Sequence, residues 1–149
     1  MNRTIFEAVD LATQHWVKFN VENNRICYVL TGVFIVNLVG NSPNWLNQKT
    51  IFDIPIPALP RSQGLHIEQY APLFTLSEVF NRGTAVNSGH AIKIFDISSV
   101  NRTTDPNIGY TSAAFQVDFA ISDIDAWINR IAYNVTLIGT IKPIENVDE

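Results

Sequence analysis

Residues 26–39 read ICYVLTGVFIVNLV, and this stretch decides the fold because it is the most hydrophobic part of the chain. It has 14 residues and includes Thr31, Gly32 and Asn37, whereas a transmembrane helix needs about 20 apolar residues. Its many β-branched side chains favour one long strand, or two strands bent at Gly32. Because the stretch is apolar on both faces, we expect it to lie centrally in a sheet or to be covered by other subunits.

The composition of the whole chain also favours β structure. Of the 149 residues, 46% are apolar, 11% are aromatic and 16% are charged. Ile, Val, Thr and aromatic residues far outnumber Ala, Leu, Glu and Lys, and they fit a pleated, half-buried surface. We expect a single domain over residues 1–149, since a chain of this length can build one core without a disulfide or structural metal.

Residues 4–19 carry the pattern of an amphipathic helix. Thr4 and the glutamate three residues after it match the capping box that begins many helices. Phe6, Val9 and Trp16 belong to a broad apolar stripe at helical spacing. The sequence therefore predicts one N-terminal helix that packs on a sheet or on a partner.

A β-domain is predicted over residues 25–142, where β-favouring runs alternate with turn residues at a spacing of roughly ten residues. The clearest run is 113–121, in which Phe115, Val117 and Phe119 share one face. Together these runs predict a mainly β fold, an antiparallel β-sandwich or barrel of about six to eight strands.

The end of the chain is predicted to be a long strand followed by an acidic tail. The strand covers residues 131–142, and Gly139 within it is expected to mark a bulge. The tail, residues 143–149, is expected to fray.

The N-terminal residues do not form a signal-peptide pattern. Glu7 and Asp10 interrupt the apolar stretch that a signal peptide needs. We therefore expect synthesis in the cytoplasm without a signal peptide, with incorporation in a particle as one destination.

Cysteine and histidine give no sign of a catalytic or metal site. Cys27 is the only cysteine and stands in an apolar run, so we interpret it as a small buried hydrophobic residue. His15, His66 and His90 each lack a second ligand at helical spacing, and no His-based metal motif is present.

Asp118, Asp123 and Asp125 form the one local acidic cluster outside the C-terminal tail. Their spacing could present oxygen ligands to calcium, but the twelve-residue loop with its central Gly and terminal Glu is absent. Glycines are scattered singly, so no loop that cradles phosphate is predicted. We assign no catalytic residue, no cofactor and no metal ligand, and we do not expect an enzyme.

The charge balance disfavours two classes of partner. The chain has 10 basic and 14 acidic residues, a net charge of −4, and three of the acids stand in the last five positions. The body of the protein is therefore nearly neutral, which argues against binding nucleic acid or an anionic membrane. We also expect no membrane span.

Low charge, a strand that is apolar on both faces and a broad helical stripe predict a non-enzymatic structural or assembly subunit. It would form homo-oligomers or dock with other structural subunits in a larger particle, such as a virion or a phage-tail-like structure. The expected interface residues are Phe6, Val9, Trp16, Tyr28, Phe34, Val36, Trp45 and Trp127.

The alternative is a β-sandwich or barrel that binds a small ligand, a lipid or a sugar, in an apolar cavity. Trp45 or Trp127 would then lie at the mouth of that cavity.

Overall fold

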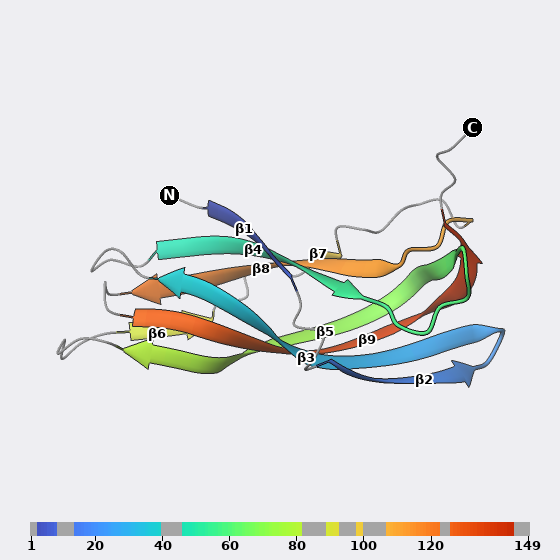
Figure 1. Ribbon diagram of the computed structural model, residues 1–149, viewed down its shortest axis with the longest axis horizontal. Coiled ribbons are helices and arrows are strands. Elements are labelled where there is room, and N and C mark those ends of the chain that lie inside the picture. The colour runs from blue at the N-terminus through green and yellow to red at the C-terminus, as the bar shows by residue number, and fades with distance from the viewer. Residues whose placement is uncertain are drawn as a thin grey trace.

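Figure 1 shows the computed structural model, which describes residues 3–8, 14–39, 46–81, 89–92, 98–99, 107–122 and 126–144. In this part of the chain there are nine strands and no helix. The strands are β1 (Arg3–Ala8), β2 (His15–Val21), β3 (Arg25–Val39), β4 (Leu46–Pro55), β5 (Gln63–Asn81), β6 (Gly89–Ile92), β7 (Ser98–Ser99), β8 (Ser112–Ser122) and β9 (Ala126–Pro143).

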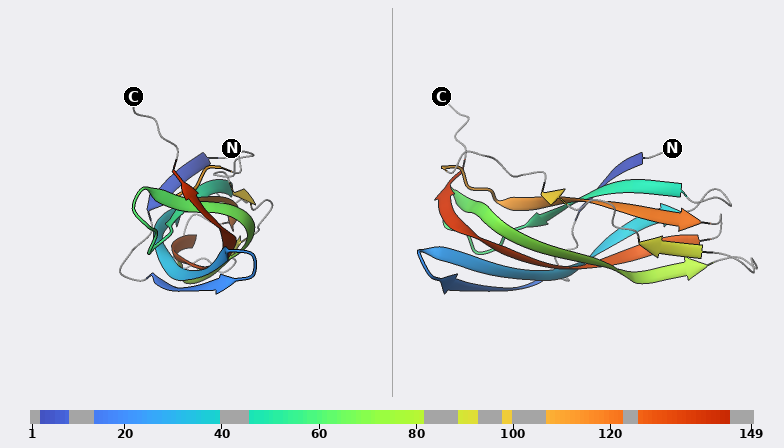
Figure 2. Two further views of the ribbon diagram at one scale, coloured as in Figure 1. Left: turned by 90° about the vertical axis from the view of Figure 1, so that its right-hand side faces the viewer. Right: turned by 180° about the vertical axis from the view of Figure 1, so that it is seen from behind.

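The strands form two sheets that lie over one another (Figure 2). One sheet has the order β1-β4-β8-β6, with β7 also paired to β8, and the other has the order β2-β3-β9-β5. Every pair is antiparallel except β1 with β4, which is parallel. The predicted mainly β, antiparallel class is confirmed, and the described strands do not close into a barrel.

The predicted N-terminal helix over residues 4–19 is wrong. That range contains β1 and most of β2, and β2 pairs with β3 continuously from His15 to Val21. Pairing with the most apolar strand of the chain outweighs the local helical pattern, because secondary-structure propensity is a weak preference that tertiary contacts override. The first strand is likewise held by its pairing with β4.

The turn between β2 and β3 explains why residues 15–19 form a strand and not part of the predicted helix. Asn23 and Asn24 have φ of 63° and 61°, and the Arg25 amide donates to the Glu22 carbonyl at 3.4 Å. Positive φ at both central residues is what a type I′ hairpin turn requires, and asparagine tolerates it better than most residues. The Asn-Asn pair is therefore the hairpin signal that the sequence analysis missed.

We expect Asn24→Gly to raise the free energy of unfolding by about 0.5 kcal/mol, because glycine adopts positive φ without steric cost. Asn24→Val should lower it by about 1–2 kcal/mol, because a β-branched residue is strained there. Urea unfolding measures both. Asn20→Gly, the same change in the regular part of β2, is the control and should be destabilising. The interpretation of the turn fails if both glycine variants lose stability equally.

Residues 26–39, the most hydrophobic stretch of the chain, form most of a single central strand. β3 has 15 residues and pairs with β2 on one side and β9 on the other. It continues through Gly32, which lies opposite Tyr133. A Cβ at position 32 would lie 2.6 Å from the Tyr133 Cζ atom, so glycine is needed here to admit the tyrosine ring.

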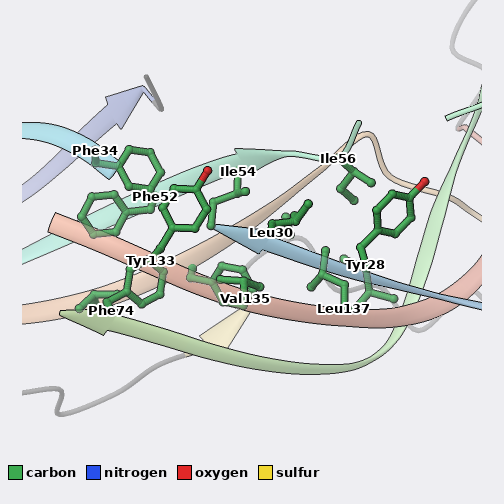
Figure 3. Packing of buried hydrophobic residues seen from close by; sticks show 14 of the residues in the cluster. Tyr28, Leu30, Phe34, Phe52, Ile54, Ile56, Phe74, Tyr133, Val135 and Leu137 are labelled. Carbon is green, nitrogen blue, oxygen red and sulfur yellow. The ribbon is translucent and has the colours of Figure 1, made fainter. Parts of the chain in front are cut away.

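The core between the sheets is a cluster of aromatic rings contributed by both sheets (Figure 3). Phe34 of β3 lies 4.3 Å from Phe52 of β4 between ring centroids, and 5.2 Å from Tyr133 of β9. Phe74 of β5 stacks on Phe52 at 5.2 Å and lies 6.0 Å from Phe115 of β8. These contacts fix the spacing of the two sheets.

We expect Gly32→Ala to lower the free energy of unfolding by about 1–3 kcal/mol, because the added methyl group forces the Tyr133 ring to move. Combining Gly32→Ala with Tyr133→Leu should cost less than the sum of the two single changes, since leucine vacates the ring position. In a Phe115→Leu background, the cost of Gly32→Ala should simply add. Urea unfolding measures these costs. If the cost of Gly32→Ala adds in full in the Tyr133→Leu background, as it should in the Phe115→Leu background, the predicted contact is contradicted.

The bulge expected at Gly139 lies on the neighbouring strand. Ile67 of β5 pairs with Gly139, but the next pair is Gln69 with Ile138, so Glu68 has no opposite residue in β9. Two more register shifts follow near Glu78. β5 is therefore an irregular strand along much of its length.

Part of the predicted tail belongs to the sheet. Pro143 pairs with Gln63, and the Ile144 amide donates to the Ser62 carbonyl at 3.4 Å. The remaining tail residues, 145–149, lie outside the described residues.

Candidate interaction surface

The sheet β2-β3-β9-β5 has one face on the core and one face turned away from it. Side chains alternate along each strand, so in β3 Leu30 and Phe34 point inward while Val33 and Ile35 point outward. We call the second side the outer face and define it by thirteen residues. They are Val17, Phe19, Cys27, Val29, Thr31, Val33, Ile35, Ala71, Leu73, Ala132, Asn134, Thr136 and Ile138.

Large apolar side chains on this face are exposed. The exposed fractions are 57% for Val17, 47% for Phe19, 47% for Ile35 and 56% for Leu73. Single exposed hydrophobic residues are ordinary in soluble proteins, but contiguous groups indicate interaction sites.

The strand register makes the outer face contiguous across the sheet. Val17 lies opposite Val29, Val29 opposite Thr136, and Thr136 opposite Ala71. This row crosses all four strands and contains only apolar and small uncharged side chains.

None of the thirteen residues is charged. The polar residues His15, Gln69 and Thr75 lie on the same side of the sheet, along its two edge strands, and charged side chains lie at the two ends of the outer face. At one end Arg25 and Glu68 form an ion pair of 3.8 Å. At the other end Ile35 lies opposite Arg130 of β9. An uncharged centre with charges at its rim is the arrangement found in protein interfaces.

A shallow hollow of about 130 Å³ opens in the outer face where β5 and β9 meet. It is lined by Gln69, Tyr70, Ala71, Thr136 and Ile138, and so it lies at the bulge of β5. The face is therefore not flat and offers a recess to a side chain of a partner.

Cys27 lies on the outer face between Phe19 and Ile138 in the register, and only 5% of it is exposed. The prediction that it is a buried hydrophobic residue is confirmed. Burial raises the pKa of its thiol above the ordinary value. The thiol therefore stays protonated at neutral pH, which makes it a poor nucleophile.

Alkaline pH should destabilise the fold. Burial raises the pKa values of Cys27 and Tyr28, and of Tyr133, where a hydrogen bond from Gln14 partly opposes the effect. The unfolded chain then loses protons at lower pH than the folded chain does. The free energy of unfolding should therefore fall as pH rises above 9.0, the ordinary thiol value, and further above 10.0, the tyrosine value.

Urea unfolding at a series of pH values from about 7 to 11 measures this fall. Cys27→Ala is the control, because it should remove the part of the fall that begins near pH 9.0 and leave the tyrosine part. Stability that stays constant or rises over this range would contradict the prediction.

The interface residues expected from the sequence fall in different environments. Tyr28 and Phe34 are fully buried in the chain's own core. Trp16 is 45% exposed at the edge of the sheet. The outward neighbours Val29 and Val33 were not selected, because the sequence does not show which face of β3 meets the core.

Among the other expected interface residues, Phe6 lies in β1, Val36 in β3 and Trp127 in β9, where the structure describes the backbone alone. Val9 and Trp45 lie outside the described residues.

The structure describes only some of the candidate metal ligands. Asp118 lies in β8 opposite Lys49, while Asp123 and Asp125 lie outside the described residues. The Nδ1 atom of His66 lies 3.1 Å from the carbonyl oxygen of Ile108. Within the described ranges, no three His, Cys, Asp or Glu residues could share a metal ion.

The described residues contain no helix long and apolar enough to cross a membrane. Comparisons with family models, with curated proteins and with solved structures each found no match to this chain.

Proposed function

We propose that this chain is a non-enzymatic structural subunit that assembles by burying its outer face against another copy of itself. The observation that carries the proposal is the uncharged outer face, which crosses four strands and exposes large apolar side chains. Removing such a face from water is the main favourable term in protein association. The low overall charge, 16% of residues, agrees with a surface that is partly covered.

The size of the apolar contribution indicates how much of the face must be buried. Fully burying one Val, Leu, Ile or Phe side chain contributes about 1.5–3 kcal/mol. Val17, Phe19, Ile35 and Leu73 are each about half exposed already, so together they contribute roughly 3–6 kcal/mol. The cost of association is about 4–15 kcal/mol. A stable contact therefore has to cover the whole outer face.

We also propose that the two sheets form an open sandwich. The sheet β1-β4-β8-β6 is then a rigid support for the sheet that carries the outer face. Packing of aromatic rings between the sheets holds the outer face in one shape. A rigid face loses little conformational entropy on binding, which suits a subunit of a particle such as a virion or a phage tail.

The ligand-binding alternative has no observation in its favour among the described residues. Phe34, Phe52, Phe74 and Phe115 occupy the space between the sheets, where a lipid or sugar would have to enter. We therefore do not advance it.

We expect light scattering behind a sizing column to give a mass well above the 16.7 kDa of one chain. Leu73→Lys should shift the mass toward the monomer by placing an ammonium group on the outer face. Ile144→Lys is the matched control, because Ile144 is 40% exposed but lies off this face. A wild-type monomer at every concentration, or equal behaviour of the two variants, would overturn the proposal.

A further inference from the structure

The two edges of the sheet β2-β3-β9-β5 differ in how they are protected. The edge strand β5 is paired at its start, where Leu65 and Tyr110 exchange backbone hydrogen bonds of 2.8 and 2.9 Å. Further along it carries a bulge at Glu68 and a proline at position 72. Pairing, bulges and proline are the devices by which natural sheets prevent association at an edge.

β2, the other edge, carries none of these devices in the part of the chain that the structure describes. It pairs with β3 without a register shift from His15 to Val21 and contains no proline. Five of its seven side chains are exposed, among them Trp16, Val17 and Phe19.

Lys18, the one lysine of β2, does not block association of another strand at this edge. Charged side chains protect an edge when they project into the path of an incoming strand. The Lys18 Nζ atom instead donates to the Ala58 carbonyl at 2.8 Å and lies 5.6 Å from the centre of the Tyr28 ring. Its ammonium group is thus bound within the chain, on the core side of β2.

An edge strand presents a row of backbone N–H and C=O groups, and the structure that matches such a row is another extended strand. We propose that β2 pairs antiparallel with β2 of a second copy, about a two-fold axis at Val17, so that two four-stranded sheets become one. This inference rests on the proposed function, because it adds a second contact, along the sheet edge, to the burial of the outer face by which the subunit assembles.

Side-chain pairing in the possible registers selects Val17 as the centre. A two-fold axis perpendicular to the sheet keeps each face on its own side, so outward residues meet outward residues. Centring on Val17 places Trp16 opposite Lys18 twice on the core side, and His15 opposite Phe19 twice on the outer side. The Trp16 ring can pack on the aliphatic part of Lys18, and the His15 and Phe19 rings opposite each other form a favourable cross-strand pair.

Neighbouring registers are less favourable. Centring on Lys18 places its two copies directly opposite each other, and this like-charge pair adds repulsion and no attraction, because each ammonium group is already held by its own chain. Centring on Trp16 pairs only residues 15–17 within β2, against residues 15–19 for the centre at Val17. Centring on Phe19 places Trp16 opposite Glu22, a residue of the turn that cannot continue the ladder. The Val17 register also makes the outer faces of both copies continuous, so a third subunit would meet an apolar face of twice the width.

Disulfide cross-linking tests the pairing and its register. In a Cys27→Ala background, Val17→Cys should form a disulfide-linked dimer under mild oxidation, reversed by a reductant. Residues opposite each other in antiparallel strands have Cα atoms about 4.5–5.5 Å apart, within the range that a disulfide spans. Phe19→Cys is the matched control, because its two copies would lie about 14 Å apart, four residue spacings along the strands.

We expect the Val17→Cys dimer to form at least about tenfold faster than the Phe19→Cys dimer, since only the first pair has disulfide geometry. Faster cross-linking of Phe19→Cys, or equal rates, would overturn the proposed register. Cross-linking by neither variant would overturn the pairing.

Hydrogen exchange on the wild-type chain gives a second readout that does not depend on the variants folding. The amides of β2 that point away from β3, which belong to every second residue of 15–21, should gain protection as protein concentration rises, because pairing covers them. If light scattering shows an assembly while these amides gain nothing, the edge pairing is wrong and the assembly proposal stands. If wild type is a monomer throughout, the assembly proposal itself fails.

Discussion

The packing of Tyr133 on Gly32 is the contact on which the rest of the structure depends. Tyr133 lies in β9, and its ring packs on Gly32 and lies 5.2 Å from the Phe34 ring, both of β3, between ring centroids. Its hydroxyl accepts a hydrogen bond of 3.2 Å from Gln14, which also donates to the Pro55 carbonyl of β4 at 3.3 Å. Tyr133 therefore packs against the central strand β3 and, through Gln14 just before β2, is linked by hydrogen bonds to the opposite sheet.

The class of fold could be predicted from the sequence because it depends on properties that each segment carries alone. Branched and aromatic residues, and an apolar stretch interrupted by Gly32, are enough to predict a mainly β protein with a central long strand. The helix failed because a capping box at Thr4 and an apolar stripe are local signals, whereas the pairing of β2 with β3 is not. The hairpin could have been predicted from Asn23 and Asn24, because it depends on their positive φ.

The interaction surface was harder to predict than the fold for a related reason. In a strand that is apolar on both faces, the sequence does not show which alternate set meets the core. That choice is made by register with β9, which places Tyr28 and Phe34 inside and leaves Val29 and Val33 outside. The low charge of the chain agrees with an uncharged surface, but only the fold shows that this surface is one sheet face with charges at both ends.

The position of β9 has a consequence for synthesis of the protein. β9 lies between β3 and β5 in the sheet, yet both of them precede it in the chain. As the polypeptide leaves the ribosome, the β2–β3 hairpin can close at once, because its partners are neighbours in sequence. β3 and β5 then remain with unpaired backbone edges and exposed apolar side chains until the strand that separates them has been translated. Over that interval the nascent chain needs protection by a chaperone or rapid completion, and its native sheet can form only after β9 has emerged.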